Sequence, residues 1–400
     1  MSRWLPHPKV PRLNFRYPRQ SEAVIVDRNS SSSLIELLAT RRVTLVLMPQ
    51  ESINLWVALR MLFSRHRDTL TYLSTYIKMV RPKLVVTGVD SNAVFYFLKS
   101  FHPDSTFISV QNGIRGGFAT KPNQDLWSLL RHLTKKLGLH PAVDYMLTLG
   151  PAHSRLFESS IDCKAISVGS LSNNSLKPKS QTTALRTTVT LISSFDGRNY
   201  RNLFEDGDTD VLRYFGSFAI SGVDYFSPLR FLTSLISSIC VSNNWDFEIL
   251  GKRGNDSAAR EEQFFLESCI HQAFKFRKKD SETSTLERAL ESSLTFVWGS
   301  TSGYELLSRG HRVVFVNHPI MNGNCVRDTS LCFGFPDRLA EDGPFWTSRL
   351  ELKHLSSLAN RVMSYSSAEW GDIVQRFSFD KFSFDPDNSI LKNLINQNLR

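Results

Sequence analysis

The sequence is poor in cysteine and lacks the spacings that hold a metal or a disulfide framework. Its five cysteines, in 400 residues, are scattered, and they form no Cys-x-x-Cys pair and no zinc pattern. Unpaired cysteines in odd number suit a reducing compartment. We therefore expect a cytoplasmic protein with no disulfides, no metal and no other cofactor. The cysteines are Cys163, Cys240, Cys269, Cys325 and Cys332.

Long apolar runs are also missing. No stretch approaches about 18 consecutive apolar residues, which is the length of a membrane-spanning helix. The first 20 residues, MSRWLPHPKVPRLNFRYPRQ, lack the apolar core of a signal peptide and are basic and rich in proline. Two interpretations stay open for this segment. It is an arm packed on the first domain, which we favour, or it contacts the inner face of a membrane.

Dense stripes of positive charge are absent too. The chain has 48 Lys and Arg against 38 Asp and Glu, a net charge of +10, without any zinc-finger, RNA-recognition or basic-zipper pattern. Nucleic acid is therefore not an expected partner. The positive balance favours a nucleotide donor, a polyanionic acceptor or an anionic membrane surface, although an ordinary basic surface explains it as well.

What the chain does contain is a regular alternation of apolar strands and amphipathic helices. Its length and its 41% of apolar residues suit two domains with full cores. Continuous apolar strands between helices predict parallel sheets covered on both faces. The predicted strands are 43–48, 83–88, 106–111, 145–150 and 165–170, and then, beyond a polar linker at 171–188, 188–194, 245–251, 273–279, 294–300 and 312–317.

This pattern predicts an α/β protein with two Rossmann-like domains facing across a cleft. We expect a first domain at residues 1–175 and a second at 176–370. The helical segment 371–400 is expected to cross back to the first domain. Because ligands bind beyond the carboxyl ends of parallel strands, the residues directly after each strand are the candidates for function.

In the first domain, three such places carry polar side chains. Asp90 opens a helix, and Gln111, Asn112 and Arg115 share the glycine-rich loop QNGIRGG. Glu158 lies in the helix that begins at Pro151. The competing interpretations are helix capping for Asp90, turn chemistry for the loop, and a solvated helix surface for Glu158.

In the second domain, Asp196 follows the first strand and Asp224 lies near the start of a helix. Either aspartate is a cap or loop residue, or a carboxylate placed for chemistry. Lys252 and Arg253 follow the next strand, where they suit a phosphate or a sugar carboxylate. Ordinary surface positions explain these two cations equally well.

The stretch GSTSGYELLSRGHRVVFVNHP, residues 299–319, predicts a strand end, a short helix and a second strand. Small hydroxyl residues at a helix start favour an anion such as phosphate. The loop is neither a Walker A motif nor G-x-G-x-x-G. Close packing of a strand–helix–strand unit would explain the same residues. The site candidates here are Ser300, Thr301, Ser302, Gly303 and His318.

Together these motifs resemble those of GT-B glycosyltransferases, with the donor loop in the second domain. The serine-rich loop with His318-Pro319 resembles the nucleotide-binding motifs of enzymes that use CMP-activated sugars. The stretches PKLVVTGVDSNAVFYFLKSFHPDSTFISVQNGIRGG, VGSLSNN and GPFW are similar to those of bacterial surface-carbohydrate proteins. The likeness is strongest to the retaining β-Kdo transferase domains of lipopolysaccharide O-antigen and capsule enzymes.

The resemblance implies transfer of Kdo (3-deoxy-D-manno-oct-2-ulosonic acid) from CMP-Kdo to a glycan acceptor, with retention through a carboxylate nucleophile and without a metal. It makes Asp224 the nucleophile, with Asp196 as rival, and Glu158 the acid/base or acceptor-side carboxylate. Lys252 or Arg253 would pair with the Kdo carboxylate. The implied CMP phosphate ligands are Ser300, Thr301 and Ser302 with Gly303, the cytidine ligand is His318, and the acceptor-side residues are Asp90, Gln111, Asn112 and Arg115.

One departure concerns the acidic-acidic-glycine motif of sialyltransferases. Its two candidates, Glu205-Asp206-Gly207 and Glu341-Asp342-Gly343, do not follow a first-domain strand, so an inverting mechanism with a first-domain base is poorly supported.

Two competing functions stay open: a transferase using UDP-, GDP- or CMP-sialic-acid-type donors, and a carbohydrate-binding or assembly module without turnover. The acceptor could be lipid-linked, and the chain could be one domain of a larger polysaccharide-synthesising enzyme.

Overall fold

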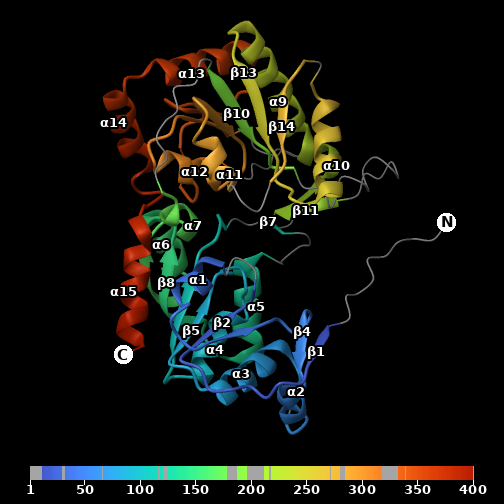
Figure 1. Cartoon of the computed structure of the whole chain (residues 1–400), viewed down its shortest axis with the longest axis vertical. Coiled ribbons are helices and arrows are strands. Elements are labelled where there is room, and N and C mark those ends of the chain that lie inside the picture. Colours follow the sequence, from blue (N-terminus) through green and yellow to red (C-terminus); the bar gives the residue numbers. More distant parts are fainter. Residues whose placement is uncertain are drawn as a thin grey trace, which may run out of the picture. The chain divides into compact units, whose positions relative to one another are not determined.

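The computed structural model (Figure 1) folds into two compact units. It describes residues 11–28, 32–64, 66–115, 118–119, 125–177, 187–195, 211–215, 218–270, 272–279, 284–317, 332–337 and 339–399, and only the backbone of 118–119, 211–215 and 218–225. The first unit lies within Met1–Asn112, Leu126–Ser172 and Asp385–Arg400. The second lies within Gly113–Asp125 and Asn173–Phe384.

The first unit is built on a six-stranded parallel sheet of order β3-β2-β5-β6-β8-β9. The chain passes from β2 to β3 on one side and then resumes at β5 on the other. The strand order therefore reverses between β2 and β5, where ligand crevices form in such sheets. The strands are β2 (Ala23–Val26), β3 (Val43–Val46), β5 (Leu84–Thr87), β6 (Thr106–Val110), β8 (Ala142–Thr148) and β9 (Asp162–Ser167).

Helices cover both faces of this sheet because successive strand residues point to opposite sides. Val24 and Val85 pack against helices α2 to α6 on one face. Ile25 and Leu84 pack on the other face against α1 and α15, so the C-terminal helix completes the core of the first unit. The helices are α1 (Ser32–Leu37), α2 (Leu55–Met61), α3 (Thr69–Val80), α4 (Phe95–Leu98), α5 (Leu126–Leu137), α6 (Pro151–Glu158) and α15 (Ser389–Asn398), with 3-10 turns at Lys99–Phe101 and Pro386–Asn388.

A two-stranded parallel sheet attaches the N-terminal segment to the first unit. Strand β1 (Arg12–Asn14) pairs with β4 (Ser52–Asn54), which directly precedes α2. The described part of the segment therefore packs on the first unit, while residues 1–10 lie outside the described residues. None of the described helices combines the length and the apolar character needed to cross a bilayer.

The second unit contains a six-stranded parallel sheet of order β14-β13-β10-β15-β16-β17. From β10 the chain builds to one side and then continues at β15 on the other, so the order reverses between β10 and β15. A small antiparallel sheet, β12-β11-β7, accompanies it. The strands are β7 (Phe118–Ala119), β10 (Thr188–Ile192), β11 (Val211–Phe215), β12 (Phe218–Ser221), β13 (Asp246–Leu250), β14 (Lys275–Arg277), β15 (Leu294–Val297), β16 (Val313–Val316) and β17 (Trp346–Thr347).

An aromatic cluster fills the core on the β16–β17 side of this sheet. Phe333 stacks on Tyr304 and contacts Phe345 and Trp346, at ring centroid distances of 4.9 to 5.3 Å. A Cβ atom on Gly343 would lie 2.2 Å from the Trp346 ring, which gives the GPFW stretch a packing role. The helices are α7 (Leu171–Ser175, which spans the unit boundary), α9 (Gly222–Ser242), α10 (Asp256–Glu267), α11 (Thr285–Ala289), α12 (Ser302–Leu307), α13 (Leu352–Ser364) and α14 (Ser367–Ser378).

Candidate functional site

The candidate site lies at the carboxyl edge of the second unit's sheet, where the strand order reverses. Strands β13, β10 and β15 are neighbours, so the residues that follow them share this edge. They are Ser193 after β10, Gly251 to Arg253 after β13, and the loop from Gly299 to Ser302 after β15. Crevices at such reversal points bind ligands in open α/β sheets.

The loop after β15 turns sharply before α12. Gly299 has a φ of 61°, a left-handed conformation that favours glycine. The Ser302 N–H donates to Ser300 Oγ at 3.3 Å, and the Gly303 N–H donates to Ser300 O at 3.3 Å. The side chains of Ser300, Thr301 and Ser302 are half-buried at the sheet edge.

Close packing explains why residue 303 is a glycine. A Cβ atom there would lie 2.6 Å from Phe315 Cε1 and 2.9 Å from Val297 Cγ1. The first turn of α12 is thereby pressed onto strands β15 and β16. At the far end of α12, Asn173 of the VGSLSNN stretch donates to Glu305 O and accepts a 2.6 Å hydrogen bond from Arg309. These contacts fix α12, and with it the loop that carries Ser300, Thr301 and Ser302, which we call the hydroxyl loop.

The segment Gly113–Arg115 reaches the same loop. The Ile114 N–H donates to Thr301 Oγ1 at 3.4 Å. A Cβ atom on Gly113 would lie 3.4 Å from Arg115 Nη1 and 3.8 Å from Thr301 Oγ1, so all three residues are close together. Arg115, which the sequence suggested for the acceptor side, thus belongs to the second unit beside the hydroxyl loop. It brings a guanidinium to a loop that has no lysine.

A buried carboxylate organises the loop after β13. Glu262 of α10 is fully buried, and both of its oxygens accept the Lys252 N–H at 3.0 Å. The Arg253 N–H donates to Glu262 Oε2 at 3.2 Å, and the Ser193 side chain also hydrogen-bonds to this carboxylate. Burial raises the pKa of Glu262, while these hydrogen bonds and the Arg253 charge act in the opposite direction. Glu262 therefore joins the loops that follow β10 and β13.

Replacing Glu262 by alanine is expected to lower the unfolding temperature, because it leaves the N–H groups of Lys252 and Arg253 without their acceptor. These hydrogen bonds are partly buried, and the loss of each costs about 0.5–1.5 kcal/mol. Glu262→Gln keeps an acceptor oxygen and should lose less. Thermal unfolding measures both variants against Glu267→Ala, an exposed glutamate of the same helix. Equal unfolding temperatures for the two alanine variants would contradict this role of Glu262.

In the first unit, three predicted acceptor-side residues connect the loops after β5, β6 and β8. Asp90 Oδ1 accepts the Asn112 N–H at 3.1 Å, and Asn112 Nδ2 donates to Gly88 O at 2.8 Å. Gln111 Oε1 accepts the Leu149 N–H at 2.9 Å. Asp90 and Gln111 are buried. The structure therefore gives both side chains a bracing role at the carboxyl edge of this sheet.

Glu158 lies elsewhere. It is the last residue of α6, which starts just after the carboxyl end of β8 at Pro151, so it is about 10 Å along the helix from that edge. Its side chain is exposed, and Oε1 accepts the Ala165 N–H of β9 at 3.0 Å. The structure does not bring Glu158 to the carboxyl edge of the sheet.

Three further predicted residues are described incompletely or not at all. Asp196 and His318 lie outside the described residues, as does Glu205-Asp206-Gly207. Asp224 is the third residue of α9, which follows β12, and only its backbone is described. Asp342, of the second acidic-acidic-glycine candidate, accepts a 2.6 Å hydrogen bond from Thr347 and pairs with Arg349 at 2.9 Å, so it anchors β17.

Two acidic residues were missed by the sequence reasoning. Glu262 shares the buried face of α10 with Ala259, Phe265 and Leu266. In the sequence, the signal that could have identified Glu262 was an acidic residue on an otherwise apolar helix face. Asp27 directly follows β2 at the reversal point of the first sheet, is buried and has a φ of 72°. Its position after the AVIV strand was the available signal. Among the described residues, no group of three or more His, Cys, Asp and Glu could hold a metal.

Solved structures with a similar fold include a polymerase and a protein described as an epimerase. The wall teichoic acid polymerase TagF, soaked with CDPG, aligns with a TM-score of 0.51 and 10% identity over 94% of this chain and 88% of that chain. A "putative UDP-N-acetylglucosamine 2-epimerase" from Listeria monocytogenes aligns with a TM-score of 0.50 and 13% identity over 94% and 95%. At these identities the likeness concerns the fold alone. It confirms the predicted GT-B architecture.

Sequence comparison supplies the family. No curated protein sequence matches the chain. The model of a protein family described as "putative O-antigen biosynthesis protein" matches residues 108–399, well over half of the chain. The match includes the Gly113–Arg115 segment, the loop at 299–303, the buried Glu262 and the C-terminal helix α15. The chain belongs to this family of O-antigen biosynthesis proteins.

Proposed function

We propose that this chain is a glycosyltransferase of O-antigen biosynthesis that transfers Kdo from CMP-Kdo to a glycan acceptor with retention of the β configuration. Family membership supports the pathway, and the GT-B fold is one that glycosyltransferases use. The fold is shared with a protein described as an epimerase, so the fold alone does not identify the reaction that this chain catalyses. The donor and the stereochemistry rest on the sequence resemblance and on the residues at the reversal point.

The observation that carries the proposal is the meeting of Arg115 with the hydroxyl loop after β15. Ser300, Thr301 and Ser302 supply hydroxyl donors at the sheet edge, and the Ile114–Thr301 hydrogen bond holds the Arg115 segment against them. A guanidinium with neighbouring hydroxyls suits a single phosphate group. CMP carries one phosphate, and this correspondence supports a CMP-sugar as the proposed donor. His318 would contact the cytidine.

Lys252 and Arg253 are proposed to bind the Kdo carboxylate. Their backbone is fixed by Glu262 at the edge of the same sheet, two strands from the hydroxyl loop. A sugar carboxylate next to a leaving phosphate puts two negative charges on one ligand. Cations on both sides of β10 would match these two charges.

Retention requires two displacements at the anomeric carbon. A carboxylate attacks this carbon as CMP leaves, and a covalent sugar ester forms. The acceptor hydroxyl then attacks the anomeric carbon, loses its proton to a base, and breaks the bond between this carbon and the carboxylate oxygen, which releases the carboxylate. We assign Asp224 as nucleophile, in the first turn of α9, with Asp196 as the rival. Glu158 is not retained as acid/base because of its place at the far end of α6.

Thermal unfolding with nucleotides tests the donor. CMP at a hundred times its Kd is expected to stabilise the protein by about 2.7 kcal/mol, and UDP and GDP by less. Arg115→Gln should weaken CMP binding about tenfold or more, because a charged hydrogen bond to phosphate is lost. Arg260→Gln, which removes an exposed arginine from α10, is the matched control. Stabilisation by UDP or GDP alone would contradict the CMP-sugar assignment.

A binding or assembly module without turnover is the competing function. Incubation with CMP-Kdo generated in situ and a glycan acceptor, followed by mass spectrometry, separates the two. Transfer product or a protein–sugar adduct supports the enzyme. CMP binding without product or adduct supports the module.

A further inference from the structure

One end of the first unit exposes a group of large apolar side chains. We call Phe15, Tyr17, Trp56, Leu59, Leu62 and Phe63 the apolar patch. All six are exposed, Phe63 to 94% and Phe15 to 65%. Trp56 and Leu59 lie three residues apart on α2, and Phe63 follows the helix. These side chains are turned to solvent, while Val57 of the same helix is buried. Single exposed apolar residues are ordinary, but a contiguous group marks an interaction surface.

The apolar patch is held in place by defined contacts. Trp56 Nε1 donates to Phe15 O at 2.9 Å, and the rings of Tyr17 and Trp56 meet edge-on at 5.7 Å. Asn54 Nδ2 donates to Arg16 O at 2.8 Å, and Asn54 Oδ1 caps α2 by accepting the N–H groups of Trp56 and Val57. The N-terminal segment and α2 therefore present their apolar side chains together. In Figure 1, β1, β4 and α2 lie side by side.

Arginines are frequent in the segments that carry the apolar patch. The described residues 11–20 and 51–68 include exposed Arg12, Arg16, Arg19, Arg60 and Arg67, against Glu51 and Asp68. The basic end of α5 adjoins this region. The pKa of Asp68 is lowered, since hydrogen bonds from Thr71 and the charges of Lys136 and His66 outweigh the opposite effect of burial. Helix α5 also exposes Arg131, His132 and Lys135.

We propose that the apolar patch docks on the surface of a membrane that contains anionic lipid. Leu59, Leu62 and Phe63 would enter the acyl boundary, and Trp56 and Tyr17 suit the headgroup level, where an aromatic ring has both apolar and polar contacts. The arginines of the same segments and the basic end of α5 would face lipid phosphates. A protein partner or a second copy does not require such an excess of exposed arginine in the same segments, which is why we favour the bilayer.

Vesicle co-sedimentation tests the docking surface. The full chain is expected to bind vesicles of phosphatidylcholine with about 30% phosphatidylglycerol, to bind pure phosphatidylcholine vesicles more weakly, and to lose affinity as salt rises, because the charge term is screened. The double variant Leu62→Ser/Phe63→Ser should bind at least about tenfold more weakly, since two exposed apolar groups no longer enter the bilayer.

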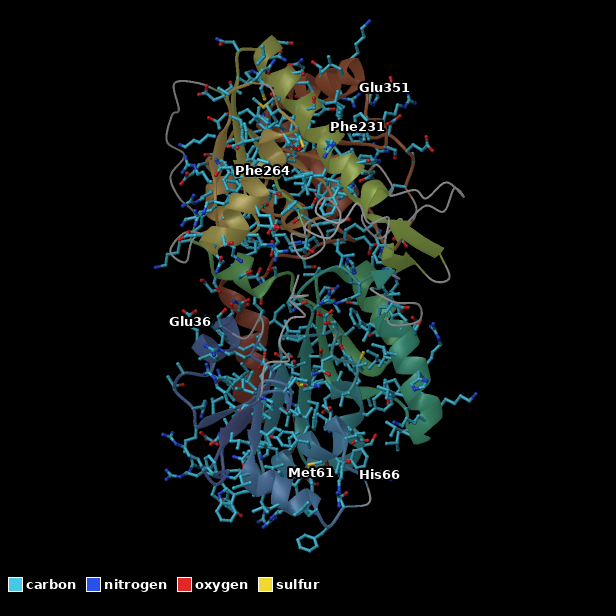
Figure 2. The ribbon with its side chains drawn as sticks, turned by 90° about the vertical axis from the view of Figure 1, so that its right-hand side faces the viewer. Glu36, Met61, His66, Phe231, Phe264 and Glu351 are labelled. Atoms are coloured by element: carbon cyan, nitrogen blue, oxygen red, sulfur yellow. The ribbon has the colours of Figure 1, made fainter. Side chains whose placement is uncertain are left out.

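Phe264→Ser is the matched control. Phe264 is 68% exposed on α10, a helix that carries Asp256, Glu261 and Glu267, so this variant should bind vesicles like the unchanged chain. Figure 2 shows Phe264 on the second unit, and Met61 and His66, which precede and follow residues 62–63 in the chain, on the first. Equal thermal unfolding of the variants would show that they fold alike.

Three results would overturn the proposal. They are no binding of the unchanged chain to anionic vesicles, equal binding by the double variant and the Phe264→Ser control, and a concentration-dependent dimer that the double variant alone disrupts. Nucleotide stabilisation requires no membrane and is measured separately. A failure of vesicle binding would therefore contradict only the membrane-docking proposal. A failure of CMP binding would contradict only the proposed donor.

Discussion

Asp224→Asn is expected to abolish sugar transfer, lowering the rate at least about a thousandfold, and to prevent the covalent protein–sugar adduct. An amide cannot act as the nucleophile that retention requires, and losses of this size follow removal of a catalytic nucleophile. The unfolding temperature should stay unchanged, because an asparagine also serves near a helix start. The measurements are product formation from CMP-Kdo and intact-protein mass spectrometry.

Asp196→Asn is the parallel variant for this experiment. If Asp196 plays no covalent part, its asparagine variant should still form the adduct. Full transfer activity in Asp224→Asn would reject the assignment of the nucleophile. Loss of the adduct in Asp196→Asn alone would make Asp196 the nucleophile. Peptide mapping of an adduct trapped on the unchanged chain identifies the modified residue directly.

Gly303→Val is expected to destabilise the second unit by about 3 kcal/mol, the upper range for overpacking a core. Its Cβ would lie 2.6 Å from Phe315 Cε1 and 2.9 Å from Val297 Cγ1 before either methyl group is placed. Both neighbours belong to buried strands, β16 and β15, and have little room to move. Thermal or urea unfolding measures the effect, and CMP stabilisation should be lost with it, since α12 carries the hydroxyl loop.

The same substitution at Gly371 provides the control. Gly371 lies within α14, and a Cβ atom there meets nothing within 4 Å. Valine and glycine differ by less than about 0.5 kcal/mol in helix propensity, so Gly371→Val should unfold at nearly the temperature of the unchanged chain. Similar stability of the two valine variants would show that the contacts at Gly303 relax freely.

The local sequence was sufficient to predict the α/β class with parallel sheets. Strands such as LVVT and VVFV are apolar at nearly every position because both faces of a parallel strand are buried, whereas the strand AVIV of β2 was not among the predicted ones. The loop at 299–303 was likewise predictable, since glycine and small hydroxyl residues closely follow the buried strand LTFV. These features depend on periodicity and on neighbours in the chain.

Tertiary structure alone decided which side chains meet. Arg115 follows a first-unit strand in sequence, yet the Ile114–Thr301 hydrogen bond joins its segment to a loop 187 residues away. Glu262 reaches Lys252 and Arg253 because α10 folds back over β13, and α15 enters the core of the first unit from the end of the chain. Such contacts depend on how helices pack on sheets, which strand periodicity does not encode. The sequence by itself therefore determined the kind of fold and the loop at 299–303. Packing decided that Arg115 lies beside this loop and that Glu262 holds the neighbouring loops after β10 and β13.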